Sequence, residues 1–482
     1  MKQRILGIIK VVCFLSLLLL CLCGITRLFQ RKTSVIKYAD FFAQKEDFDV
    51  LFFGSSHVVN GIFPMELWED YGIVSYNCGG HGHQLATTYW HMQNILEYTT
   101  PKLIVLDIFG MHYETKYAAA EQLHESFDIM PISETKYRAV QDLFDNPESE
   151  DYASRWAYFW DFSVYHSRWN DLKAEDFSYK VNCQKGAEAR INVAEPMDYT
   201  IIGIDEVYAE DTISQQYLCR IIEDCQERGI EILLTHLPYP AVVEYQQAAN
   251  MTYKVAEKYD VPYIDFVHMN SVVEYDTDCY DKGSHLNPSG ARKVTDYLGE
   301  YIMDNYEIPD RRKDEVYEQW HKDYDEYTQW KYEKLNEQTE LDDLLMLLRD
   351  EELSACIYIA GSSGYLEDGQ VHRLLDNAVI EGSLKKLVPA TVNKSDYLLV
   401  IDRLQEKIWD FDLAQDKDTL DSSMGRVVID DFSSGDKKIW IDKVNMLEKE
   451  SADVEVWTKV LVFDASTGEI VSEFERAGER ME

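Results

Sequence analysis

"DVLFFGSSHVVNGIFP", residues Asp49 to Pro64, is the stretch that decides the fold. Its run Val50 to Phe53 is continuously apolar, which is typical of a strand buried on both faces of a parallel sheet. The run ends abruptly in the residues GSSH, Gly54 to His57. Small residues commonly end a strand, but a turn of this kind can also present a nucleophilic serine at the carboxyl edge of a sheet. The rest of the chain has to decide between these two interpretations.

Further apolar runs follow the first one, separated by stretches with helical periodicity. The five runs are Val50–Phe53, Ile73–Tyr76, Leu103–Phe109, Ile230–Leu234 and Val261–Phe266. The helical stretch before the fourth run ends on Gly229, a residue type that commonly stops helices. Apolar strands that alternate with helices predict an α/β fold, in which helices cover both faces of a parallel sheet. Ligand sites in such sheets form beyond the carboxyl ends of the strands, where Ser56 is expected.

The composition is strongly acidic. The 482 residues include 47 Lys and Arg against 87 Asp and Glu, a formal net charge of −40. A surface of this charge repels phosphate backbones, so nucleic acid is not expected as a partner. The length allows more than one domain, and the hydrophobic share of 46% is ordinary for a globular protein.

The first residues form an apolar segment. The stretch Ile5 to Ile25 is about long enough to cross the hydrocarbon core of a membrane, and basic residues flank it on both sides. It contains no A-x-A pattern for signal cleavage. Leu20 and Leu22 precede the two cysteines that a lipoprotein could use, where small residues would be expected. We therefore expect residues 1–30 to be an uncleaved signal anchor of a single-pass protein whose bulk is extracytoplasmic.

Nine cysteines are present, and three of them lie in the apolar segment. The other six are Cys78, Cys183, Cys219, Cys225, Cys279 and Cys356. They have no C-x-x-C spacing, which argues against zinc ligation and against a disulfide framework. We interpret them as isolated buried thiols.

A long insertion interrupts the α/β alternation of the domain predicted at 31–306. Residues 111–212 are too many for a simple connection, so we expect a helical cap over the sheet edge. Its aromatic-rich stretch "YASRWAYFWDFSVYHSRW" is expected mainly to form the core of the cap. His166 and Arg168 in that stretch are candidate substrate-binding residues.

The pattern of apolar and aromatic residues changes after residue 306. Residues 307–349 read as a helical linker, with an aromatic stripe that predicts a packing face. The stripe consists of Tyr317, Trp320, Tyr324 and Tyr327. Residues 350–482 return to short apolar runs and predict a smaller α+β domain, in which "KVLVFDASTGEIVSEF" is a hairpin with its turn at 464–468. No catalytic constellation is evident there.

The second chemical signal is "YDKGSHLNPSGARKVTDYL", Tyr280 to Leu298. An acid and a histidine share one loop after the last predicted strand. A lone histidine there would more often be a capping residue. Together with the serines after the first strand it predicts nucleophilic catalysis, because the ends of parallel strands meet at one edge of a sheet.

These motifs resemble those of a known family. "FFGSSH", "YNCGGHG" and "DKGSHLNPSGARKVTDYL" are similar to the motifs of the SGNH (GDSL-type) hydrolase superfamily over Asp49 to Tyr306. More narrowly they resemble its membrane-anchored extracytoplasmic members, such as DltD and the alginate-type O-acetyltransferases. The resemblance implies a flavodoxin-like three-layer α/β/α fold.

The resemblance also implies catalytic roles. Ser56, and not Ser55, matches the nucleophile, and His285 matches the general base. A carboxylate has to hold the imidazole in the correct tautomer. Asp281 stands one residue further from His285 than the family's D-x-x-H spacing, at which Lys282 lies. We therefore expect Asp281 to orient His285, with Asp278 as the alternative.

The expected oxyanion donors are the backbone N–H groups of Ser56 and Gly80, with Gly79 and Gly82 as competitors for the second. The family's third donor, an asparagine after the third strand, is missing. "VLDIFGMHYE" has Asp107 and His112 there, and Asn77 is a candidate substitute. A weaker oxyanion hole would suit an activated acyl donor better than a stable ester.

The remaining histidines near these motifs have lesser predicted roles. His57 adjoins the nucleophile and is a candidate substrate-binding residue, and His81 and His83 are expected to line the groove. Their spacing fits no common metal pattern, so we expect no metal and no cofactor.

The leading hypothesis is a membrane-anchored serine O-acyltransferase or esterase that acts on a cell-surface polysaccharide or teichoic-type polymer. The resemblance implies a membrane-bound O-acyltransferase as a partner that delivers the acyl group. The alternative is a non-catalytic carbohydrate- or partner-binding surface protein on the same scaffold. The C-terminal domain also resembles the ILEI/PANDER-like modules, on the residues "SDYLLVIDR", "DSSMGRVVIDDF" and "VLVFDASTGEIVSEF". That resemblance implies binding of a small ligand, glycan or partner.

Overall fold

The computed structural model divides into two compact units. The first comprises residues 1–188, 199–269 and 298–321, and the second comprises 189–198, 270–297 and 322–482. The residues that the structure describes are 2–44, 47–147, 152, 154–178, 183–194, 203–207, 211–269, 271–282, 285–380, 382–416, 418–430, 438–442, 444–447 and 454–479.

The first unit is built on a parallel sheet, as the sequence predicts. Its five strands run in the order β2-β1-β3-β4-β5, the doubly wound order of flavodoxin-like folds. The strands are β1 Val50–Phe53, β2 Ser75–Asn77, β3 Leu103–Asp107, β4 Glu231–His236 and β5 Tyr263–Asp265. Every residue of β1 is fully buried, because this strand has a neighbour on each side and helices on both faces.

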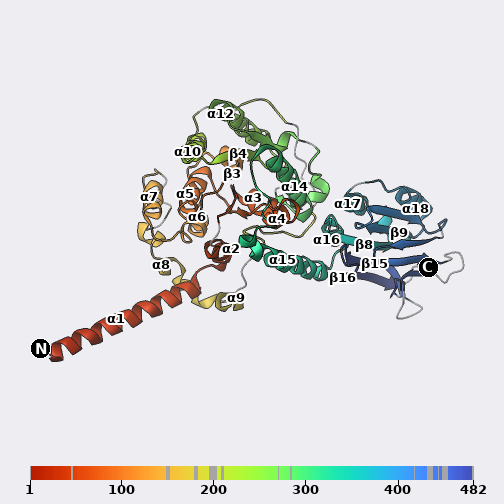
Figure 1. Ribbon diagram of the computed structural model, residues 1–482, viewed down its shortest axis with the longest axis horizontal. Coiled ribbons are helices and arrows are strands. Elements are labelled where there is room, and N and C mark those ends of the chain that lie inside the picture. The colour runs from red at the N-terminus through yellow and green to blue at the C-terminus, as the bar shows by residue number, and fades with distance from the viewer. Residues whose placement is uncertain are drawn as a thin grey trace. The chain divides into compact units, whose positions relative to one another are not determined.

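Helices cover the two faces of this sheet (Figure 1). α5, α10 and α12 lie on one face, while α3, α4 and the second half of α14 lie on the other. Their bounds, with those of α11 and the 3-10 turns, are α3 Ser56–Gly61, α4 Pro64–Tyr71, α5 Leu85–Ile95, η1 Phe109–His112, α10 Ile213–Arg228, α11 Val243–Ala249, α12 Met251–Tyr259, η5 Phe266–His268, α14 Pro288–Asn305 and η6 Glu315–Tyr317. α10 ends at Gly229, whose φ of +70° is the left-handed helix stop that the sequence predicts.

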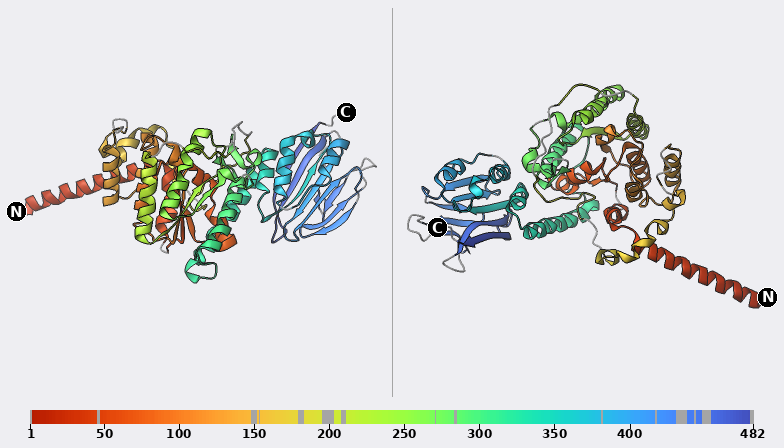
Figure 2. Two further views of the ribbon diagram at one scale, coloured as in Figure 1. Left: turned by 90° about the horizontal axis from the view of Figure 1, so that it is seen from above. Right: turned by 180° about the vertical axis from the view of Figure 1, so that it is seen from behind.

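The N-terminal helix α1, Lys2–Phe29, projects from the first unit as a single rod (Figures 1 and 2). Its stretch Arg4–Phe29 is long and apolar enough to cross a membrane. α2, Lys32–Ala43, follows after two residues and returns to the body of the unit. Tyr38 and Phe41 of α2 are buried there.

The predicted insertion at 111–212 contains short helices. They are α6 Ala120–Phe127, α7 Glu134–Phe144, η3 Arg155–Tyr158, α8 Phe162–Tyr165, η4 His166–Asn170 and α9 Ala174–Phe177. Their aromatic side chains separate by type. The tyrosines at 152, 158 and 165 are buried, whereas the tryptophans at 156, 160 and 169 are exposed. The expectation that the aromatic stretch mainly forms a core is therefore wrong for its tryptophans.

In the described residues from 341 to 479, the second unit contains two antiparallel sheets and a layer of helices (Figure 2). The larger sheet has the order β10-β9-β8-β15-β16 and the smaller one β11-β12-β13-β14. The bounds are β8 Leu353–Ile359, β9 Tyr397–Asp402, β10 Lys407–Asp412, β11 Thr419–Ser422, β12 Gly425–Ile429, β13 Ile439–Ile441, β14 Val444–Asn445, β15 Val454–Asp464 and β16 Ile470–Glu479. The helices are α15 Glu318–Glu337, which starts in the first unit, α16 Leu341–Leu347, η7 Tyr365–Glu367, α17 Gly369–Ala378 and α18 Leu387–Asn393.

Alternation along β8 explains these three layers. Ala355 and Ile357 pack in a cluster with residues of α16, α17 and α18. Cys356 and Tyr358 point the other way and pack with residues of the smaller sheet. Successive side chains of a strand face opposite sides, so one apolar strand supplies two cores.

Two predictions about the C-terminal half are confirmed. β15 and β16 form the predicted hairpin, whose turn residue Gly468 has a φ of +70°. The aromatic stripe is a packing face, because Tyr317, Trp320, Tyr324 and Tyr327 are all buried.

The segment 270–297 belongs to the second unit by its contacts. It contains α13 Tyr275–Asp278, β6 Cys279–Asp281, β7 His285–Leu286 and the first half of α14. Gln370 of α17 donates to the carbonyl of Asp276 at 2.6 Å, and Asn377 donates to Ser289 Oγ at 2.7 Å. The predicted histidine motif is therefore packed against a helix of the C-terminal domain.

Candidate active site

The turn after β1 brings the serines to the carboxyl edge of the parallel sheet. Gly54 has a φ of +153°. A Cβ atom at this position would lie 2.6 Å from Val58 Cγ2 and 2.8 Å from Asp107 Cβ. Glycine is required here because both the backbone conformation and the close approach to Asp107 exclude a side chain.

The two serines of this turn have different environments. Ser55 is 2% exposed, and its Oγ caps α3 by accepting from the His57 backbone N–H at 3.4 Å. The same Oγ lies 3.2 Å from His57 Nδ1. Ser56 is the first residue of α3 and is only partly buried. Of the two serines, Ser56 is therefore the more exposed.

His57, a candidate substrate-binding residue, is buried beside this turn. Its side chain is 5% exposed. The ring packs with its centroid 3.9 Å from that of Phe109 and 5.1 Å from that of Tyr239. The ring therefore helps to fill the space above the sheet edge.

Two of the predicted oxyanion donors are engaged elsewhere. The Gly80 N–H donates to the carbonyl of Gly54 at 3.1 Å. The side-chain amide of Asn77 donates to the carbonyls of Val58 and Ile62 at 2.6 and 2.9 Å. Both groups hold the turns after β1 and β2 in place, so the structure does not support an oxyanion role for Gly80 or Asn77.

The histidine motif forms a small hairpin in the second unit. Asp281 of β6 and His285 of β7 stand opposite each other in the antiparallel register. Asp281 Oδ2 lies 2.7 Å from His285 Nδ1, and Asp281 Oδ1 accepts from the His285 backbone N–H at 2.8 Å. Lys282, next to Asp281, has a φ of +32°.

Asp278, the alternative partner of His285, has other contacts. It is fully buried, and its carboxylate lies 2.8 Å from Lys293 Nζ and 2.7 Å from Ser289 Oγ. Asn377 also approaches it, at 3.5 Å. These contacts join α13, α14 and α17, which identifies Asp278 as a structural residue of the second unit.

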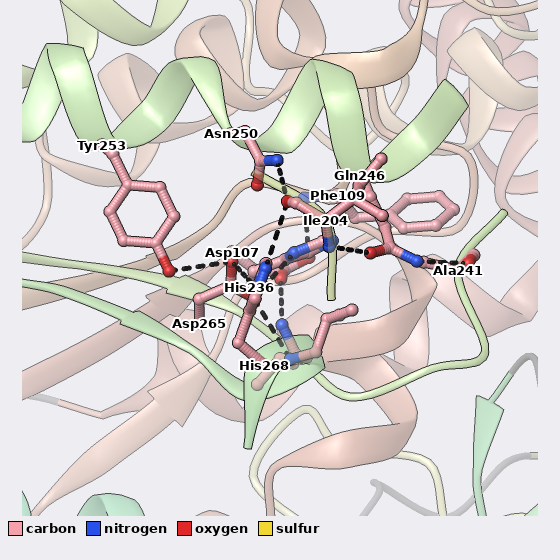
Figure 3. Close-up of polar contacts among 12 residues, drawn as sticks. Asp107, Phe109, Ile204, His236, Ala241, Gln246, Asn250, Tyr253, Asp265 and His268 are labelled. Atoms are coloured by element: carbon pink, nitrogen blue, oxygen red, sulfur yellow. Dashed lines mark hydrogen bonds and ion pairs between the residues drawn. The ribbon is translucent and has the colours of Figure 1, made fainter. Parts of the chain in front are cut away.

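A polar cluster that the sequence analysis missed lies at the ends of β4 and β5 (Figure 3). Asp265 Oδ1 lies 3.2 Å from His236 Nδ1, while Oδ2 lies 2.8 Å from His268 Nδ1 and accepts from Tyr253 at 3.2 Å. Burial alone would raise the pKa of Asp265, but the hydrogen bonds and charges of the two histidines outweigh it and lower that pKa below 3.8. The sequence contains a sign of this cluster, because the polar residues His236 and Asp265 stand at the ends of β4 and β5.

Asp107, at the end of β3, belongs to the same edge (Figure 3). Its carboxylate accepts from the backbone N–H groups of Leu237 and Phe109 at 3.0 and 3.3 Å. Burial raises the pKa of Asp107 to about 6, although the two N–H groups and His236 oppose the shift. His112, the other residue noted there, bonds to the carbonyl of Phe109 at 2.6 Å.

A small pocket of about 30 Å³ lies beside the turn after β2. Its polar wall comprises Lys37, His81, His83, His91, Glu125 and Glu188. The fully buried Lys37 of α2 donates from Nζ to the carbonyl of Gly79 at 2.7 Å. Burial lowers the pKa of Lys37 to about 8, although the charge of Glu188 opposes this. His81 and His83, which were predicted to line a groove, line this pocket.

Arg168 and His166, two further candidate substrate-binding residues, lie in η4. Both Nη atoms of Arg168 are engaged: Nη1 donates to the carbonyls of Phe29 and Gln30 at the end of α1, and Nη2 lies 3.1 Å from the carboxylate of Asp176. His166 is exposed and its Nδ1 lies 3.1 Å from the carbonyl of Ser163. Arg168 is therefore a contact of the N-terminal helix.

Across the described ranges, no three His, Cys, Asp or Glu side chains are grouped so that they could hold a metal ion. The cysteines in those ranges form no disulfide bond. Burial raises the pKa of Cys225 to about 12, so this thiol stays protonated at neutral pH.

No protein-family model matches the sequence, and no curated protein is similar to it. Among solved structures, a "putative acylhydrolase" from Bacteroides fragilis aligns with 57% of this chain and 98% of its own, at 13% identity and a TM-score of 0.30. A TM-score of 0.30 does not establish a common fold, and no residue role follows from it.

Proposed function

We propose that the protein is a serine acyltransferase or esterase of the SGNH type, with Ser56 as nucleophile, His285 as general base and Asp281 as the carboxylate that orients His285. The observation that carries the proposal is the pair of contacts from Asp281 to the ring and backbone of His285. Two bonds from one carboxylate fix both the position and the tautomer of an imidazole, which is what a general base requires.

The chemistry follows from these roles. Nε2 of His285 takes the proton of the Ser56 hydroxyl while Oγ attacks the acyl carbonyl carbon. The tetrahedral intermediate collapses, and the leaving alcohol departs with the proton from His285, so that an acyl-serine remains. A hydroxyl group then attacks the acyl-serine and restores Ser56. Transfer results when that hydroxyl belongs to a sugar or polyol, and hydrolysis results when it belongs to water.

The accessibility of Ser56 and the position of its turn support the assignment of the nucleophile. The turn lies at the carboxyl edge of a parallel sheet, where active sites of such folds form. Ser55, by contrast, is buried and occupied as a helix cap. Ser56 belongs to the first unit and His285 to the second, and the proposal requires the two side chains to meet.

The contacts of the predicted oxyanion donors bear on which acyl donor the protein uses. Gly80 and Asn77, two of the predicted donors, bond to the turns beside them. Few donors favour an acyl group that is already activated. We propose a cell-surface polysaccharide or teichoic-type polymer as the acceptor and a membrane-bound O-acyltransferase as the partner that supplies the acyl group.

Labelling of the full-length protein with a fluorophosphonate probe tests the proposal. Wild type should be labelled, while Ser56→Ala and His285→Ala should lose the label. Ser55→Ala is the matched control and should keep it, at a cost of about 1 kcal/mol in stability for the lost cap. Equal labelling of wild type and Ser56→Ala would refute the nucleophile. No labelling of a folded wild type would favour the alternative, a non-catalytic binding protein.

A further inference from the structure

The exposed tryptophans of the first unit are concentrated in one segment. Of the ten tryptophans in the chain, the three that are largely exposed are Trp156, Trp160 and Trp169, at 76%, 54% and 66%. Phe177 in the same segment is 69% exposed. We call these four side chains the aromatic collar. Exposed large apolar groups that gather in one place mark an interaction surface.

The segment that carries the collar holds the end of the N-terminal helix. Arg168 Nη1 donates to the carbonyls of Phe29 and Gln30 at 2.5 and 2.8 Å. The ring of Phe162 stacks on that of Phe29, with a centroid distance of 6.3 Å. Gln30 also donates to Asp161. In Figure 1, α8 and α9 flank the point where α1 meets the rest of the unit.

These contacts are fixed by a buried charge cluster. Asp176 of α9 is 5% exposed and contacts Arg168 through both carboxylate oxygens at 3.1 Å. Lys32 Nζ lies 3.7 Å from the same carboxylate. The cluster joins α9 and η4 to the start of α2, so the collar has a defined position relative to the end of α1.

We infer that the aromatic collar lies in the headgroup region of the membrane that α1 crosses, at the C-terminal end of α1. The segments α8, η4 and α9, which carry or adjoin the collar, contact α1, and Arg27, Arg31 and Lys32 mark the polar end of that helix. Tryptophan is the side chain most favoured at this boundary, because its ring is apolar while its N–H can bond to headgroups or water. The protein would thus be held on the membrane surface by two elements rather than by a single helix.

Quenching of tryptophan fluorescence by brominated lipids tests this assignment. Full-length protein is reconstituted into phosphatidylcholine vesicles, with bromine either near the headgroup or near the chain ends. The signal of interest is the difference between wild type and the triple variant Trp156→Phe, Trp160→Phe, Trp169→Phe. We expect headgroup-proximal bromine to quench this difference signal several-fold more than bromine at the chain ends. Trp90→Phe is the matched control, because Trp90 is buried and its removal should leave lipid quenching unchanged.

Acrylamide, an aqueous quencher, provides the opposite readout. A difference signal that acrylamide quenches and brominated lipid does not would overturn the inference, because the collar would then face water. A signal shielded from both quenchers would overturn it too and would point to a second copy or another protein as the occupant. If the triple variant does not fold, Trp156→Phe alone gives the same comparison, since this residue is the most exposed of the three.

Discussion

His285 receives two contacts from Asp281, one to the ring Nδ1 at 2.7 Å and one to the backbone N–H at 2.8 Å. The hairpin register sets this geometry by placing the two residues opposite each other. Because Nδ1 is bound to the carboxylate, Nε2 is the nitrogen that can exchange a proton with a hydroxyl.

We expect Asp281→Asn and Asp278→Asn to affect different properties. Asp281→Asn should lower the turnover of an activated ester by up to about 10⁴-fold, because the imidazole loses its orienting carboxylate. It should leave the melting temperature nearly unchanged, since Asp281 is partly exposed. Asp278→Asn should destabilise the fold by about 3 kcal/mol, because it removes the charge partner of Lys293 from a buried site.

Ester turnover and thermal unfolding, measured on both variants, check this pair of expectations. A folded Asp278→Asn variant with normal stability and strongly reduced turnover would reverse the two assignments. Lys293→Met serves as a control, because it should destabilise the second unit as Asp278→Asn does without touching His285.

Arg168→Ala should weaken the attachment of α1 and leave catalysis intact. The variant loses four hydrogen bonds, to Phe29, Gln30 and both carboxylate oxygens of Asp176, each worth about 1 kcal/mol or more since a charged group is involved. We expect a lower melting temperature and an unchanged KM for a water-soluble ester. His166→Ala, at an exposed position, should change neither property. A raised KM with normal stability would contradict this expectation and indicate that Arg168 contacts the substrate.

The difference in unfolding free energy between wild type and Lys37→Met should depend on pH, because the ammonium group of Lys37 is buried. The pKa of Lys37 is about 8, below its usual 10.5, because the ammonium group is buried. Between these two pH values the unfolded chain binds a proton that the folded chain has released, so wild type gains stability relative to the variant as pH rises from 8 to 10.5. The gain should approach about 3 kcal/mol. Denaturant unfolding at pH 7.5 and pH 10 measures it, and a constant difference between the two proteins would contradict the shift.

Asp107→Asn should show the opposite trend at acid pH. Burial raises the pKa of Asp107 from 3.8 to about 6, so the folded chain keeps a proton that the unfolded chain loses in this range. The stability contributed by that proton is present below pH 4 and is lost as pH rises through 6. Relative to wild type, the variant should therefore gain about 3 kcal/mol between pH 4 and pH 7. Unfolding at the two pH values checks this, with Asp310→Asn as an exposed-site control that should show no such gain.

Local patterns in the sequence predicted much of the architecture. The five apolar runs became the five parallel strands, and Gly229 became the stop of α10. Such features depend on periodicity and on backbone preferences of single residues, which are readable from neighbours in the chain. The serine turn and the Asp281–His285 spacing were visible for the same reason.

The polar residues at the ends of β3, β4 and β5 are visible in the sequence, but the sequence does not show which of them lie together. Asp107, His236 and Asp265 are the last residues of β3, β4 and β5. Which of them touch depends on strand order and on the twist of the sheet, and neither is encoded in a local pattern. Only the folded sheet shows that Asp265 contacts His236 and His268.

The sequence by itself determined which segments are strands and helices, and which residue types lie at the ends of the strands. Tertiary structure alone decided that Arg168 contacts the end of α1, and that the tyrosines of residues 152–169 are buried while the tryptophans are exposed. It also decided that Gly80 and Asn77 bond to the turns beside them. The physical reason is that secondary structure follows from short-range conformational preference, whereas the partner of a polar side chain depends on which distant backbone groups folding leaves within hydrogen-bond distance.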